Sequence, residues 1–480
     1  MPPNLPNVVF FISDQQRADT MPGVRRVKAY TPHLEWLCER GVVFQNAFCT
    51  SPVCSPARSS ILSGLYPHAT GLVANDTHVP SIQSLSPEVR LLADYLKPKG
   101  YVCAYVGKWH LCTGSDRRGF SDFATRLEIH DTDNVGDDDA VNFAERIGVQ
   151  LGRHYRDHLN DEDDLDRPGT GGSTRLPLAF HPSALQAQQA VRFVRTMQGE
   201  SRPFLLVYSC QEPHPLGLRH HVCPRPFDRM YDPDSMPVPD RRRDPNAARL
   251  VKQRAPVWGF KHLIPADRHS DDELRAMTAG YYGAVSYVDH LLGIVLGALI
   301  ETNQWNKTLF VFTSDHGEML GNHGLLKKGC VLFEELVRVP LLVVPPGGST
   351  SSRRTDQLVS QADLVPTVLN WCDAEVPAGL HGADIRPLIE GNSGPIHDGI
   401  ALQFHSMHWG DKPAPLRGWR TETWKYVEDT SGPVELYDLR KDAGEMENLV
   451  GNPASLPVLH AMSAALHTWL KRAGDPWPDV

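Results

Sequence analysis

The chain has 480 residues, of which 22% are charged and 41% hydrophobic, and its formal net charge is −9. This composition excludes a largely disordered chain, and the negative charge gives no reason to expect nucleic acid or an acidic membrane as a general partner. The length allows one large domain and a smaller one.

The start of the chain and its cysteines bear on its compartment. Residues 1–7 carry neither the basic nor the apolar segment of a secretory signal, and the apolar helical stretch 291–300 is too short to cross a bilayer. The nine cysteines have irregular spacings and form no C-x-x-C pair, which favours reduced thiols. We therefore expect a cytoplasmic protein without a membrane segment.

Strands and helices alternate along residues 1–390. Val8–Ser13 is an apolar run typical of a buried parallel strand, and it ends at Asp14-Gln15. The later predicted elements are helix 31–40, strand 42–47, helix 91–97, strand 101–106, helix 183–197, strand 204–209, helix 271–302, strands 308–313 and 339–344, and helix 363–372. This α/β alternation predicts a large, mostly parallel sheet flanked by helices.

The pattern changes past about residue 391. Short alternating segments at 400–404, 418–427 and 435–438 precede a helix at 456–472, which predicts a small antiparallel sheet with a closing helix over 391–480. Two stretches, 113–180 and 215–257, break the rhythm of the first part, and we expect irregular insertions near the substrate side. We interpret His220-His221 and residues 241–243 there as exposed loop, and contact with an anionic substrate is the alternative.

Cys54 lies in a proline-punctuated loop, residues 50–64, that runs into a short apolar helix. Pro56 suits a first helical turn, so Ser55 is the predicted N-cap and Cys54 lies just before the helix. Unpaired N–H groups and the helix dipole favour negative charge there, and Arg58 lies one turn on. A thiolate or a bound anion would be stabilised, although an isolated cysteine is also compatible with a buried structural thiol.

Several predicted strands end in polar groups that can carry chemistry. The carboxyl ends of parallel strands meet at one edge of a sheet, so these groups can converge. Two carboxylates, an amide and an imidazole would suit Ca²⁺, Mg²⁺ or Mn²⁺, and the cation with Arg58 and lysines would bind a tetrahedral oxyanion. The alternative is that the aspartates cap helices and the histidines are packing groups. The residues concerned are Asp14, Gln15, Lys108, His110, His214, Asp315 and His316.

The segment Cys54-Ser-Pro-Ala-Arg58 resembles the C-x-P-x-R signature of the type I, formylglycine-dependent sulfatases of the alkaline phosphatase superfamily. Other segments appear in the order of that family, namely 14–15, 107–110, 212–215, 313–318, 328–329, 361–369, 435–439 and 445–448. The resemblance implies an alkaline phosphatase-like fold and a sulfuric ester hydrolase. A non-catalytic binding protein on this fold is the alternative from another class.

The resemblance also implies a modified cysteine. Cys54 would be oxidised to Cα-formylglycine by a separate maturation enzyme, and the hydrate of the aldehyde would supply an oxygen nucleophile beside one divalent cation. The residues that would bind this cation together with residue 54 are Asp14, Gln15, Asp315 and His316.

The remaining roles come from the same resemblance. Arg58 would steady the hydrate, and Lys108 and Lys328 would neutralise sulfate oxygens. His110 would take the proton of the second hydroxyl. His214, with Lys328 able to share the role, would protonate the departing alcohol or donate a hydrogen bond to it.

Asn75 follows Cys54 by a spacing also found in diester-cleaving members of the superfamily, and it would hold a non-bridging oxygen of the substrate. A turn-forming asparagine before Asp76 is the alternative interpretation.

The chain departs from many family members at Gln15, where they have Asp, and at His316, where they have Asn. Both changes occur in a branch that includes choline sulfatases and phosphonate monoester hydrolases. The softer ligand set shifts the expected metal from Ca²⁺ alone towards Ca²⁺ or Mn²⁺. It leaves a sulfate monoester and a phosphorus diester open as substrates, and Lys108 favours the sulfate. The alcohol part is open among carbohydrate, choline-like and aryl groups, and the branch is compatible with a homo-oligomer.

Overall fold

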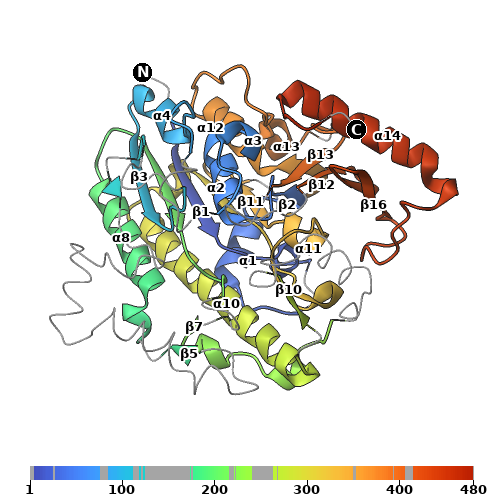
Figure 1. Ribbon diagram of the computed structural model, residues 1–480. Helices are drawn as coiled ribbons and strands as arrows, with labels where there is room; N and C mark the ends of the chain where they lie inside the picture. The colour runs from blue at the N-terminus through green and yellow to red at the C-terminus, as the bar shows by residue number, and fades with distance from the viewer. Residues whose placement is uncertain are drawn as a thin grey trace.

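A large sheet organises most of the chain in the computed structural model (Figure 1). Its eight strands lie in the order β12-β2-β11-β9-β1-β6-β3-β4. They are β1 (Asn7–Ser13), β2 (Val42–Phe48), β3 (Val102–Gly107), β4 (Phe123–Ala124), β6 (Phe204–Ser209), β9 (Thr308–Ser314), β11 (Leu341–Val344) and β12 (Arg353–Ser360). The structure describes residues 5–24, 27–75, 85–111, 118–120, 123–124, 173–174, 177–215, 221, 223–239, 263–266, 269–349, 353–392, 394–405 and 415–478.

The central strands of this sheet are parallel. β1 pairs in parallel with β6 on one side and with β9 on the other, and β6 pairs in parallel with β3. β11 is the exception, because it runs antiparallel to both β9 and β2. The prediction of a mostly parallel sheet is therefore confirmed. The edge strand β12 had no counterpart among the predicted elements, because its first five residues are only partly buried and lack an apolar run.

Helices cover both faces of the sheet (Figure 1). Because side chains alternate along a strand, Phe10 of β1 packs into a core with α2, α4 and α12, whereas Phe11 packs into a second core with α1, α8 and α10. The bounds of these helices are α1 (Pro32–Cys38), α2 (Cys54–Ser63), α4 (Leu92–Leu96), α8 (Pro182–Thr196), α10 (Asp271–Glu301) and α12 (Leu364–Trp371). A strand buried on both faces explains the uninterrupted apolar run at the start of the sequence.

The longest described helix is α10, with 31 residues. It begins with a capping box, in which Ser270 and Glu273 bond each other's backbone N–H groups. Its length and apolar composition would allow it to cross a membrane, but 72% of the apolar window is buried inside the structure. Tyr287 and Leu291 lie in the core beneath β1, so α10 packs as a core helix of the α/β layers.

A second, antiparallel sheet is formed by β13 (Ile400–Phe404), β14 (Leu416–Arg420), β15 (Trp424–Asp429) and β16 (Gly432–Asp438). One face, with Tyr426, packs on Leu466 of α14 (Leu456–Ala473), and the other, with Val427, joins the core of the large sheet. The predicted antiparallel sheet and closing helix are confirmed. The single segment expected at 418–427 was wrong, because residues 421–423 turn the chain between β14 and β15.

The remaining α-helices and strands of the described chain are short. They are α3 (Pro67–Thr70), β5 (Ser173–Thr174), β7 (Cys223–Pro224), β8 (Leu263–Pro265), β10 (Leu325–Lys327), α11 (Glu334–Val337) and α13 (Arg386–Glu390). Most of the predicted insertions at 113–180 and 215–257 lie outside the described residues. The domain boundary at 390/391 stays a prediction.

Candidate active site

The candidate site lies at the carboxyl ends of four neighbouring parallel strands, β9, β1, β6 and β3. Asp14 follows β1, Asp315 follows β9, Lys108 follows β3, and His214 lies in the turn after β6. Asp14 N–H donates to the carbonyl of Glu212 at 3.0 Å, and Lys108 N–H donates to the carbonyl of Ser209 at 2.9 Å. The sheet itself thus fixes the backbone from which these side chains project.

Cys54 is the first residue of helix α2. The predicted N-cap at Ser55 was wrong. The cap is Val53, in extended backbone, and Pro56 still falls in the first turn, where its missing N–H costs nothing. The N–H of Ser55 donates to Asn75 Oδ1 at 2.9 Å. Every residue of the helix is buried, which holds the Cys54 side chain in one place.

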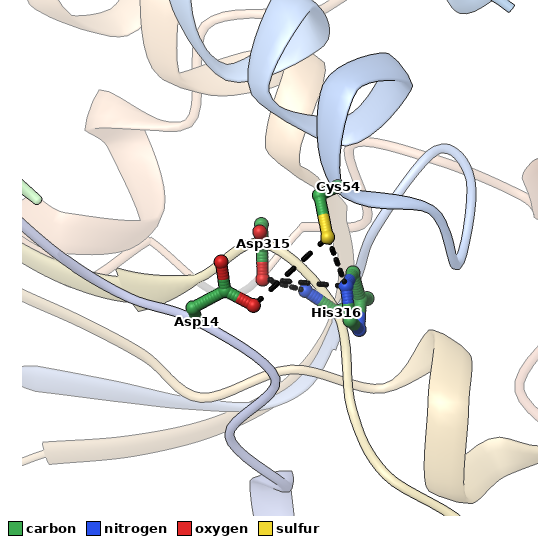
Figure 2. Close-up of side chains that lie close together, drawn as sticks. All are labelled: Asp14, Cys54, Asp315 and His316. Carbon is green, nitrogen blue, oxygen red and sulfur yellow. Dashed lines mark hydrogen bonds and ion pairs between the residues drawn. The ribbon is translucent and has the colours of Figure 1, made fainter. Parts of the chain in front are cut away.

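The Cys54 side chain points into a group of buried ligand-type residues (Figure 2). Its sulfur lies 3.2 Å from His316 Nε2 and 4.0 Å from Asp14 Oδ1. One ligand atom from each of Asp14, Cys54, Asp315 and His316 lies within 4.8 Å of the others. Residues from three distant parts of the sequence therefore form one compact cluster.

Arg58 holds the two carboxylates of this cluster together. Its Nε donates to Asp315 Oδ2 at 2.9 Å, and one terminal nitrogen donates to Asp14 Oδ2 at 3.1 Å. The other terminal nitrogen donates to the Lys108 carbonyl at 2.9 Å and to Ser209 Oγ at 2.7 Å. The guanidinium is fully buried, so it neutralises charge where water cannot.

The donor atoms of the cluster fit a hard or borderline divalent cation. The Nδ1 atom of His316 lies 2.9 Å from the Gly317 carbonyl, which accepts only, so Nδ1 carries a proton. Nε2, the ring nitrogen 3.2 Å from the Cys54 sulfur, would bind a metal in its unprotonated form. The amide oxygen of Gln15 is buried and has no hydrogen-bond partner among the described residues. With Asp14 and Asp315, these atoms make a mixed oxygen and nitrogen ligand set.

Two lysines supply positive charge beside Cys54. Lys328 Nζ donates to the cysteine sulfur at 2.7 Å and lies 2.9 Å from His316 Nε2, and Lys108 Nζ donates to Asp14 Oδ2 at 2.5 Å. Burial alone would raise the pKa of the Cys54 thiol, but Lys328, Lys108 and His316 hold this pKa well below its usual range. Burial likewise opposes ionisation of Asp14, whose pKa is nevertheless lowered by Lys108 and Arg58. The pocket thus favours an anion at residue 54.

Both predicted histidines lie at this pocket. His110 lies close enough to Cys54 to help lower the pKa of its thiol. Burial and the nearby Lys328 lower the pKa of His214 to about 3, so its ring is neutral at neutral pH. His214 Nδ1 lies 2.8 Å from the Pro215 carbonyl and carries the proton, which leaves Nε2 as an acceptor.

Asn75 and His221 have surroundings that differ from those expected from the sequence. Asn75 turns its side-chain oxygen to the start of α2, which neither of its two interpretations had included. His221 was expected on an exposed loop, but it is buried, with Nδ1 2.6 Å from the Pro213 carbonyl and its ring against Tyr281. His220 and residues 241–243 lie outside the described residues.

The sequence did not reveal several side chains that support the site. Ser209 accepts from Arg58, Gln361 Nε2 donates to the Asp315 carbonyl at 3.1 Å, and Glu318 accepts from Gln15 Nε2. Glu318 and Gln361 fell within segments that resembled the sulfatases, but nothing local gave them a role. The only signal for Ser209 was its place at a strand end.

A model of the family described as sulfatase matches residues 6–374, a span that includes every residue of the cluster. The chain belongs to the sulfatase family. A second model, described as the C-terminal part of N-sulphoglucosamine sulphohydrolase, matches residues 321–472 of this sulfatase. The predicted enzyme class, a hydrolase of the sulfatase family, is confirmed.

Three relatives illustrate the range of the family. An ulvan-active sulfatase of Formosa agariphila is 28% identical, covering 98% of this chain and 82% of its own. The multifunctional alkaline phosphatase superfamily protein PehA of Trinickia caryophylli is 28% identical, covering 96% and 95%. The crystal structure of a phosphonate monoester hydrolase of Agrobacterium radiobacter superposes with a TM-score of 0.79 at 24% identity, covering 98% and 96%, and shows the shared fold.

Glu212 gives this sulfatase a testable pH dependence. Its carboxyl is buried and accepts from Ser183 Oγ at 2.9 Å, and burial raises its pKa to about 7 from 4.5. The stability that the protonated group contributes is complete below pH 4.5 and is lost as the pH rises through 7. Relative to Glu212→Gln, the free energy of unfolding of the natural protein should therefore fall by roughly 2–3 kcal/mol from about pH 5 to about pH 8. Urea unfolding of both proteins measures this, and a constant difference would contradict it.

Proposed function

We propose that the chain hydrolyses a sulfate monoester at the edge of the large sheet, with an oxygen nucleophile made from Cys54. The observation that carries this proposal is the surroundings of the Cys54 side chain. Its sulfur lies 2.7 Å from Lys328 Nζ and 3.2 Å from His316 Nε2, with the carboxylate of Asp14 beside it. A nucleophile in this position would meet cationic groups able to hold the oxygens of a sulfate.

The nucleophile requires conversion of Cys54 to formylglycine by a maturation enzyme, the protein partner that this proposal needs. The hydrate of formylglycine supplies one hydroxyl for attack on sulfur and a second whose deprotonation releases sulfate and restores the aldehyde. The net reaction consumes water and yields the free alcohol and hydrogen sulfate.

One divalent cation would be held by Asp14, Gln15, Asp315 and His316 together with residue 54. Ca²⁺ is the first candidate and Mn²⁺ the second, because the set contains two carboxylates and an imidazole. When bound, the cation lowers the pKa of a neighbouring hydroxyl and offsets the charge of the sulfate. Gln15 and His316 also support placing the chain in the branch that includes choline sulfatases and phosphonate monoester hydrolases.

Arg58, Lys108 and Lys328 would provide the fixed positive charge of the reaction. Arg58 donates to both buried aspartates, which favours their ionised forms as ligands. The ammonium groups of Lys108 and Lys328 would bind the sulfate oxygens, on which charge increases as the bond to the alcohol breaks.

Two proton transfers complete the assignment. His110, which lies close to residue 54, would take the proton from the second hydroxyl. Lys328 is the readier donor to the departing alcohol, because His214 is neutral at neutral pH. His214 would share this role once it is protonated, which the negative charge of the substrate favours.

Mass spectrometry of the peptide around residue 54, with the protein made in a host that has the maturation enzyme, tests the nucleophile. We expect an aldehyde at position 54, and active protein that carries only the thiol would overturn the proposal. A panel of sulfated sugars, choline-like sulfates and aryl sulfates would then identify the alcohol part of the substrate.

A phosphonate monoester or phosphodiester hydrolase is the second candidate, favoured by the amide of Gln15 and the imidazole of His316. Turnover of an aryl sulfate and an aryl phosphonate monoester by one preparation distinguishes the two. We expect the sulfate to be preferred. Lys108 adds a positive charge to the site, and a diester has fewer charged oxygens for that charge to neutralise.

Replacing Lys108 with alanine tests this preference. The variant should lose about 10²–10³-fold in kcat/KM for the aryl sulfate, because one charged donor to the developing anion is removed. Its loss on the phosphonate monoester should be at least about tenfold smaller. The matched control is Lys441→Ala, at an exposed position whose lysine pairs only loosely with Asp438, 3.4 Å away. Equal losses on both substrates would contradict the assignment of Lys108 to the sulfate oxygens.

A further inference from the structure

We infer that Glu318 is a positioning residue that fixes the side-chain amide of Gln15, so that Gln15 presents its oxygen and not its NH₂ group to the cation. The inference rests on the cation site of the proposed function and adds a residue that acts through one of its ligands. An amide binds a metal ion only through its oxygen, so the orientation of this amide decides whether Gln15 is a ligand.

The hydrogen bonds of Glu318 fix the direction of the amide. Glu318 is 1% exposed and lies on the loop after β9. Its Oε1 accepts from the backbone N–H groups of Leu320, at 3.0 Å, and Lys327, and its Oε2 accepts from Gln15 Nε2. A carboxylate offers only acceptors, so the atom of Gln15 that faces it must be the NH₂ group. The amide oxygen is therefore on the opposite side, where it is buried and has no hydrogen-bond partner among the described residues.

The rest of Gln15 has little freedom. Its backbone is left-handed, with φ 64°, its N–H donates to Asp315 Oδ1 at 3.0 Å, and its carbonyl accepts from the Tyr281 hydroxyl at 2.9 Å. The remaining choice is a half-turn of the amide, which would bring its oxygen against the Glu318 carboxylate and turn the NH₂ group away from it. Glu318 makes that half-turn unfavourable, because two acceptors would then face each other.

Glu318 also links Gln15 to the lysine beside Cys54. The N–H of Lys327 that Glu318 Oε1 accepts belongs to the residue before Lys328, whose Nζ lies 2.7 Å from the cysteine sulfur. One buried carboxylate thus supports both a metal ligand and the loop that carries a sulfate-binding cation. This second contact is structural, so the experiment must separate it from the control of the amide.

Exchanging the carboxylate and the amide between residues 318 and 15 separates the control of the amide from the structural contact with the Lys327 loop. In Glu318→Gln, the two backbone N–H groups still need an acceptor, so the new amide keeps its oxygen with them and turns its NH₂ group to Gln15. Gln15 must then rotate, and its own NH₂ group would face the cation. Adding Gln15→Glu restores an acceptor towards residue 318 and an oxygen towards the cation. Gln15→Glu alone instead places two carboxylates against each other.

The four proteins are prepared with residue 54 converted, and the affinities for Ca²⁺ and Mn²⁺ are measured by competition with a fluorescent chelator. We expect Glu318→Gln to weaken binding by roughly 10–100-fold. The affinity of the double variant should be no more than about threefold weaker than that of the natural protein, because the exchange of the two residues restores the oxygen ligand. Glu39→Gln, an exposed substitution, is the control for loss of one carboxylate.

Two results of these metal-binding measurements would overturn the role of Glu318. Unchanged binding in Glu318→Gln, or equal weakening in that variant and the double variant, would overturn the inference, since a purely structural role predicts no rescue. If Glu318→Gln does not fold, the double variant must still bind at least about tenfold more tightly than Gln15→Glu alone, and equality would overturn the inference. If the natural protein binds neither cation, the proposed site fails first, which is distinguishable from failure of the role of Glu318.

Discussion

Replacing Cys54 with alanine is expected to reduce kcat/KM for every sulfate ester by at least about 10⁴-fold, the range found when a nucleophile is removed from an otherwise intact site. In the proposed site Lys108 and Lys328 would still bind the anion, so KM should change far less than kcat. Steady-state kinetics on an aryl sulfate, with both proteins loaded with the same metal, measures this split.

A matched control separates chemistry from folding. Cys103 is another buried cysteine, on β3, and its sulfur lies near the carbonyls of Ala93 and Tyr101. Cys103→Ala makes the same substitution at a core position and should keep full activity with a small loss of stability. A loss of less than about a hundredfold in Cys54→Ala would show that the nucleophile lies elsewhere.

The sequence predicts the parts of this molecule that depend on local pattern. The buried apolar run of β1 and the equivalent runs of β6 and β9 could be read directly, because a strand covered on both faces needs them. Parallel alternation then placed Asp14 and Asp315 at the same edge. The C-x-P-x-R motif marked Cys54 and Arg58. The α/β fold class and the family follow from these features, and both are confirmed.

What the sequence could not predict depends on contacts between distant segments. Nothing near β11 shows that it runs antiparallel to β9. The direction follows from the pairing of Leu341 with Thr313, which brings the chain back to the sheet at the same end of β9 that it left. The bond from Gln15 to Glu318 spans 303 positions, and the bond from Ser55 to Asn75 replaces the side-chain cap that the local pattern predicted. Polar residues at such positions look like ordinary surface residues until the partner is known.

Among the residues that support the site, Arg58 should contribute most to stability, because its guanidinium donates to two buried carboxylates. Removing one partner of a buried ion pair leaves charge without compensation, so Arg58→Ala should lower the free energy of unfolding by about 3–5 kcal/mol. Urea unfolding in the presence of a chelator measures the loss. Arg386→Ala, which breaks a partly exposed pair with Glu390, should change it by less than about 0.5 kcal/mol.

The metal dependence of this loss connects stability to the proposed site. A divalent cation between Asp14 and Asp315 would replace part of the positive charge that Arg58 provides, so Arg58→Ala should destabilise the metal-loaded protein less than the chelated protein. Arg58→Lys keeps the charge, but its single ammonium group cannot reach both carboxylates, the Lys108 carbonyl and Ser209 together, so it should fall between the natural protein and the alanine variant. Equal losses with and without metal would mean that the cation does not sit between these two aspartates.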